Sequence, residues 1–90
     1  KLLLSSEKSL MDNKIKIYPN PFTNKLFIDL DKDMVSPSVI YLYNSSGKLV
    51  SYNFWDPSKY YIDYSRLSDG IYNMVLSSKD YTIRKKISKK

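Results

Sequence analysis

Apolar and polar residues alternate in short runs along the chain, and turn residues interrupt the runs about every ten positions, a rhythm typical of β-sandwiches and barrels. Alternation with a period of two places successive side chains on opposite faces of a strand. It predicts seven strands, at residues 15–18, 25–31, 39–43, 48–54, 60–64, 71–77 and 81–87. No segment has a convincing helical period that could supply a crossover, so we expect antiparallel pairing. The pattern predicts an all-β fold, a seven-stranded antiparallel Ig-like β-sandwich.

The same alternation predicts the core. We expect Leu67 to close one end of it, and Tyr61 and Ile62 to face opposite sides of their strand. Lys85 interrupts the apolar face of the last run, which favours an edge strand whose lysine stem packs while its ammonium group reaches water. The side chains predicted to point inward are Leu26, Ile28, Leu30, Ile40, Leu42, Val50, Tyr72, Met74, Leu76, Tyr81, Ile83 and Ile87.

Turn residues separate the runs. Residues 19–21 read Pro-Asn-Pro, and two prolines remove two backbone donors, so the first strand must stop there. Residues 44–47 read Asn-Ser-Ser-Gly and predict a hairpin in which Gly47 supplies a positive φ. A corner is expected at residues 65–70. Residues 1–13 are mostly polar and are interpreted as a linker, which leaves residues 14–90 as the folded domain.

Composition excludes several kinds of chemistry. The 90 residues include no cysteine and no histidine, which rules out disulfides, zinc fingers and Ser-His or Cys-His catalysis. The 42% hydrophobic and 27% charged residues are typical of a soluble globular domain, and no run is long enough for stable membrane insertion. Because the chain begins at Lys1, we expect it to be a piece of a longer protein. Neither an enzyme activity nor a cofactor is expected.

The positive charge is concentrated at the C-terminal end. Of the net charge of +6, residues 79–90 contribute +5, from six basic residues against Asp80. A nucleic-acid-binding protein usually spreads its basic residues over one face, so we expect no nucleic-acid partner. Two interpretations of the cluster remain. It is either a solvated tail that blunts an edge strand, or an address that a partner protein reads.

Other motifs carry weaker signals. Asp29, Asp31 and Asp33 have the spacing of a calcium loop, but Met34 replaces the glycine and Ile40 the glutamate that such a loop needs, so a solvated strand end is expected. Residues 44–46 also match a glycosylation sequon, which the turn explains equally well.

Aromatic residues suggest one functional alternative, a non-catalytic carbohydrate-binding or Ig-like spacer module. The large rings that cover a small β-sandwich serve chiefly to bury its surface. The rings predicted to face outward, which could instead form a sugar-stacking platform, are Phe27, Tyr41, Tyr43, Tyr60 and Tyr64.

Four motifs occur in a recognisable order, at residues 17–22, 40–50, 62–72 and 85–90. Together they resemble the type A C-terminal sorting domain of the bacterial type IX secretion system. The resemblance covers roughly residues 15–90, the whole expected domain. The residues that match the family's motifs are Pro19, Asn20, Pro21, Gly47, Asp69 and Gly70, and in the ending Lys85, Lys86, Ile87, Ser88, Lys89 and Lys90.

The resemblance implies a function. Such domains end larger cargo proteins of Bacteroidetes-type bacteria, fold as Ig-like sandwiches, and direct secretion to the cell surface through the periplasm and outer membrane. The implied partners are the type IX translocon, its shuttle proteins, the upstream cargo domain, and a sortase-like cysteine protease that cuts within residues 1–14 or upstream.

Edge-strand physics suggests how the signal works. The last strand would offer unpaired backbone groups to a partner strand, and its lysines would attract an acidic receptor surface. On this hypothesis, deleting residues 87–90 leaves a folded domain that no longer exports a fused reporter.

Overall fold

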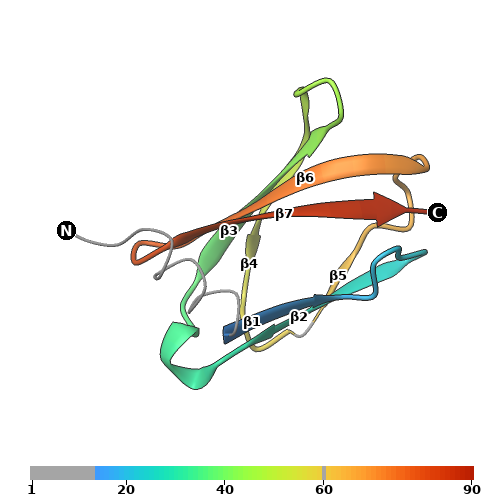
Figure 1. Cartoon of the computed structure of the whole chain (residues 1–90). Coiled ribbons are helices and arrows are strands. Elements are labelled where there is room, and N and C mark those ends of the chain that lie inside the picture. The colour runs from blue at the N-terminus through green and yellow to red at the C-terminus, as the bar shows by residue number, and fades with distance from the viewer. Residues whose placement is uncertain (1–13, 60) are drawn as a thin grey trace.

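Two antiparallel β-sheets make up the fold in the computed structural model, which describes residues 14–59 and 61–90. The expected linker at residues 1–13 lies outside the described residues, as does Tyr60. Figure 1 shows the arrangement. The elements are β1 (Ile15–Tyr18), β2 (Lys25–Leu30), the 3₁₀ turn η1 (Lys32–Met34), β3 (Ser38–Asn44), β4 (Leu49–Trp55), β5 (Tyr61–Asp63), β6 (Gly70–Ser77) and β7 (Thr82–Lys89).

Strand pairing follows the expected antiparallel pattern throughout. One sheet has the order β1-β2-β5, and the other has the order β4-β3-β6-β7. The chain passes from the three-stranded to the four-stranded sheet between β2 and β3, and β3 pairs with both β4 and β6. The prediction of an all-β fold with seven antiparallel strands is therefore confirmed.

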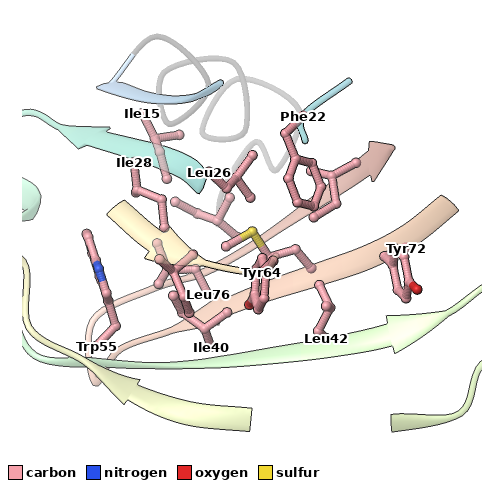
Figure 2. Packing of buried hydrophobic residues seen from close by; sticks show 14 of the residues in the cluster. Ile15, Phe22, Leu26, Ile28, Ile40, Leu42, Trp55, Tyr64, Tyr72 and Leu76 are labelled. Atoms are coloured by element: carbon pink, nitrogen blue, oxygen red, sulfur yellow. The ribbon is translucent and has the colours of Figure 1, made fainter. Parts of the chain in front are cut away.

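A single hydrophobic core lies between the two sheets in a sandwich-like arrangement. Figure 2 shows Leu26 and Ile28 of β2 pointing toward Ile40 and Leu42 of β3. Leu30 and Leu67 pack at its margin. The inward predictions that the structure confirms as buried are Leu26, Ile28, Ile40, Leu42, Tyr72, Met74, Leu76, Tyr81, Ile83 and Ile87.

Val50 is the wrong core prediction, since it is 40% exposed. The register between β3 and β4 shifts beside it, at Leu42 and Tyr43, and such a bulge breaks the alternation of side chains. Trp55, at the far end of β4, is buried instead. β4 thus contributes to the core at Trp55, where its pairing with β3 is regular, and not at Val50, where the register shifts.

The short turn η1 was not expected from the sequence. The Met34 amide donates to the Asp31 carbonyl, and the Met34 side chain enters the core. The ammonium group of Lys14 pairs with the carboxylate of Asp33, which fixes this turn against the start of β1. Three residues are too few to show a helical period, so the pattern of the sequence could not reveal it.

Three buried tyrosines differ in what their hydroxyl groups do. Tyr72 donates to the Ser68 carbonyl at 2.7 Å, four residues upstream, and Tyr81 donates to the Met34 carbonyl at 2.8 Å. The Tyr64 hydroxyl has no hydrogen-bond partner among the described residues. Burial accordingly raises the pKa of Tyr64, since the charged phenolate is costly away from water.

Candidate recognition surface on the last strand

The last strand, β7, lies at one edge of the four-stranded sheet. It pairs with β6 along its whole length, from Thr82 opposite Ser77 to Lys89 opposite Gly70. An edge strand leaves every second backbone group pointing away from its single neighbour. The position of the strand agrees with the expectation from Lys85, whose side chain is half-buried.

Residues 19–22 cover part of this edge, and we call them the proline clip. The Asn20 side-chain amide donates to the Lys86 carbonyl at 3.2 Å, and its oxygen accepts from the Ser88 amide at 2.9 Å. The Phe22 amide donates to the Ser88 carbonyl at 2.8 Å, and the Lys90 amide donates to the Phe22 carbonyl at 2.9 Å. The first and last sequence motifs therefore bind each other.

Phe22 anchors the clip. Its side chain is fully buried, and its ring lies 6.1 Å from the ring of Tyr64. Figure 2 shows Phe22 entering the core beside the other buried side chains. Burial of a phenylalanine side chain stabilises a fold by about 2–3 kcal/mol. The clip is thus held by a core residue on one side and by four hydrogen bonds to β7 on the other.

The open part of the edge is the first half of β7. Because both backbone groups of Ser88 point toward the clip, the alternation of the ladder turns those of Thr82 and Arg84 outward as well. No partner for these groups is recorded among the described residues. The unpaired backbone groups expected on the last strand are therefore confined to its first half, because the clip covers its end.

The basic side chains of β7 divide between its two faces. Arg84 and Lys86 point outward and are exposed, and Lys90 is exposed at the end of the chain. Lys89 instead follows Ile87 on the inward face and is only 8% exposed. Its ammonium nitrogen lies 4.0 Å from an Asp69 carboxylate oxygen. Lys89 is therefore not solvated, contrary to what the first of the two interpretations of the basic cluster required.

The deletion hypothesis loses its physical basis for the same reason. Residues 87–90 include the buried Ile87 and Lys89. These two residues pair with Tyr72 and Gly70 of β6. Removing them would also strip the clip of three of its hydrogen bonds. A truncation would therefore confound loss of the signal with loss of the fold.

A comparison with protein families identifies the family to which the clip motif and the C-terminal motif belong. The model of the secretion system C-terminal sorting domain matches residues 16–90, which is most of the chain. The chain belongs to the type IX secretion C-terminal sorting domain family. No protein in the curated set matches it.

Membership of the sorting-domain family establishes the general role. The family is a targeting signal, not an enzyme family. It implies a secreted cargo protein that is exported across the outer membrane and that interacts with the secretion machinery. Within the described residues, no helix has the length and apolar character to cross a membrane.

Two further motif positions of the sorting domain lie at the end of β7, on the side away from the clip. Gly70, with a φ of +152°, opens β6 directly opposite Lys89, and Asp69 precedes it. Gly47 lies elsewhere, in the β3–β4 hairpin that projects from the sheet in Figure 1, with a φ of +88°. The motif residues thus lie around the end of β7, except Gly47, which lies in a distant turn.

The aromatic residues of this sorting domain do not form the platform considered above. Phe27 lies with Tyr18 and Tyr61 on the outer face of the three-stranded sheet, at ring distances of 5.6 and 6.1 Å. Tyr41 belongs to the outer face of the other sheet, and Tyr64 is buried between the sheets. Tyr43, two residues after Tyr41 on β3, faces the same side of the sheet as Tyr41, and Tyr60 is outside the described residues. The outward prediction is wrong for Tyr64, because β5 ends at Asp63 and strand alternation does not extend to Tyr64.

Phe22 is the site residue that sequence analysis missed. An apolar ring directly after Pro-Asn-Pro was the available signal, because such a residue has little reason to follow a polar turn unless it is buried. However, Phe22 contacts residues of β7 that lie at the other end of the sequence, and local alternation contains no information about such a contact.

Proposed function

We propose that the secretion machinery reads a composite surface made of the proline clip and the outward face of β7. The supporting observation is that the amide of Asn20 bonds to both Lys86 and Ser88. These bonds hold two motifs, 66 and 68 positions apart, in one fixed geometry. A rigid surface of this kind costs a receptor little conformational entropy on binding. The translocon and its shuttle proteins are the proposed readers.

Electrostatics would add to this recognition. Arg84, Lys86 and Lys90 are the exposed basic side chains of the surface, while Lys85 is half-buried and Lys89 is inward. An acidic receptor surface would attract them and orient the cargo, and added salt would weaken the attraction. Ile87 and Ser88 would support the geometry instead of carrying charge.

We propose an Ig-like topology for the sandwich. In chain order, the sheets 1-2-5 and 4-3-6-7 have the pairings A-B-E and C-F-G of an immunoglobulin domain, with the fourth strand moved to the second sheet. The Tyr72 hydroxyl bond to Ser68, near the start of the sixth strand, is the arrangement of a tyrosine corner. Both features support this assignment.

We also propose the boundaries and the processing of the chain. Residues 1–13 would link an upstream cargo domain to a sorting domain at residues 14–90. A sortase-like cysteine protease would cut within residues 1–14 or upstream of them. The cargo would then be secreted or retained at the cell surface after crossing the periplasm and outer membrane.

Export of a fused fluorescent reporter from a type IX host tests the composite surface. The double variant Lys86→Glu with Lys90→Glu reverses exposed charges on the surface without removing a buried group. The control, Lys32→Glu with Lys59→Glu, makes the same change in net charge at exposed positions elsewhere. We expect the control to be exported and the first variant to accumulate in the periplasm.

The clip is tested separately with Asn20→Ala in the same reporter. We expect lower export, with the folded domain retained by circular dichroism. Equal export of all the variants would reject the composite surface, and equal loss in both charge variants would indicate dependence on net charge alone.

A further inference from the structure

The other edge of the four-stranded sheet is β4, and apart from the bulge at Val50 no described residue protects it. Leu49–Trp55 contains no charged residue, no proline and no glycine, in a seven-residue strand. Long uncharged edges of this kind readily pair with another strand. The remaining edges among the described residues are protected: β7 by the clip and its cations, β1 and β5 by having only four and three residues.

The free backbone groups of β4 belong to Tyr52 and Phe54. Counting the ladder across the sheet from Ser88, the alternation turns the groups of Ile40 and Leu42 toward β4. Their partners are Asn53 and Ser51, which therefore bond inward. The intervening residues of β4 must point outward.

The side chains at this edge are unusually exposed for their type. Phe54 is 86% exposed and Tyr52 is 65% exposed, on the same outer face of the sheet. The Tyr52 ring stacks on Tyr41 of β3, with ring centroids 6.1 Å apart and planes 11° apart. The edge thus combines free backbone groups with two exposed rings, of which Tyr52 is held by stacking.

We propose that β4 is a strand-addition site for β4 of a second copy of this chain, which would join two sheets into one of eight strands. The argument is self-complementarity, which a two-fold interface requires. Antiparallel pairing with Tyr52 facing its own copy places Val50 opposite Phe54 and Lys48 opposite Asp56 at both ends. The strand has no like charges to bring together.

The described part of the chain leaves this edge accessible. Lys14, where the described chain begins, leads into β1, at the opposite edge of its sheet from β5. β4 and β5 line the same groove, through Val50, Asn53 and Ile62, so they lie on the other side of the domain. β7 is the far edge of the four-stranded sheet. Pairing through β4 would leave the proposed recognition surface free.

Sedimentation of the 90-residue chain over a range from about 1 µM to about 1 mM tests the proposal. We expect the molar mass to double with concentration. Tyr52→Pro removes an outward amide together with the ring that stacks on Tyr41. It removes no backbone bond between β3 and β4, and dimerisation should weaken at least about tenfold. Arg84→Pro is the matched control, because it removes an equally free amide at the opposite edge, and it should dimerise normally.

Amide hydrogen exchange provides a second measurement that needs no variant. In the concentrated wild-type chain, the amides of Tyr52 and Phe54 should exchange at least about tenfold more slowly than in dilute solution, with Arg84 unchanged. A monomer at the highest concentration, a Tyr52→Pro variant that dimerises like the wild type, or unchanged exchange at Tyr52 would overturn the proposal. Export is not part of either readout, so this outcome is independent of the secretion role.

Discussion

Buried hydroxyl groups stabilise this fold only where they have partners. Tyr81 and Tyr64 are both tyrosines of the core, but only the Tyr81 hydroxyl has a hydrogen bond, to the Met34 carbonyl. We expect Tyr81→Phe to lower the free energy of unfolding by about 1–2 kcal/mol, because it leaves a buried carbonyl without its donor. Tyr64→Phe should be neutral or stabilising. Urea denaturation of the two variants measures the difference, and an equal loss in both would contradict this account.

The Asn20 side chain is the residue that joins clip and strand. Removing it in Asn20→Ala breaks two hydrogen bonds at the surface, which should cost about 1 kcal/mol of stability. The Ser88 amide should then exchange with solvent about tenfold faster, since its only recorded acceptor is gone. Thr23→Ala, an exposed neighbour in the same connection, is the control and should leave both quantities unchanged. Unaltered exchange at Ser88 in Asn20→Ala would show that the clip does not protect the strand.

Alternation predicts burial well where a strand is regular and poorly where it is not. Leu26 and Ile28 were placed correctly because β2 keeps its register with both neighbours. Val50 lies at a bulge, and Lys89 is inward because the alternation continues through a charged residue that composition marked as exposed. Charge counted along a sequence therefore overstates the charge that a strand presents to solvent.

Among the elements, the β3–β4 hairpin depends on backbone conformation and not on packing. Gly47 has a φ of +88°, yet a Cβ atom placed there would meet nothing within 4 Å. We expect Gly47→Ala to cost about 1 kcal/mol through backbone strain alone, and Gly47→Asn to cost less, since asparagine tolerates a positive φ better. Thermal unfolding measures both variants. If alanine costs no more than asparagine, strain is not what makes glycine necessary here.

Elements were more predictable than the contacts between them. Hydrophobic alternation and turn residues located all seven strands to within a few residues. The proline clip escaped detection because its hydrogen bonds join Asn20 to residues 66 and 68 positions away, and no local pattern encodes such a closure. For the same reason, the sequence predicted that β7 lies at an edge but not that its end is covered.

At the scale of the whole molecule, the carboxylates determine how stability depends on pH. The hydrogen bond from Lys14 lowers the pKa of Asp33, and backbone amides of Ser58 and Ser65 lower the pKa values of Asp56 and Asp63. Each carboxylate is therefore charged more readily in the folded state than in the unfolded chain. The unfolded chain binds more protons in acid, so stability rises with pH in that range.

This balance predicts an acid-sensitive domain with constant stability near neutrality. The stability from Asp33, Asp56 and Asp63 is complete well above their ordinary pKa of 3.8, and it should be lost as pH falls from about 5 through that value to the lowered pKa values of the folded state. With no histidine in the chain, stability should change little between about pH 6 and pH 8. Urea denaturation at a series of pH values measures this dependence. Asp63→Asn should make the loss of stability at low pH less steep. Asparagine binds no proton, but its side-chain oxygen still accepts a hydrogen bond from the Ser65 amide. If the unfolding free energy of this variant falls as steeply in acid as that of the wild type, groups other than Asp63 dominate the pH dependence.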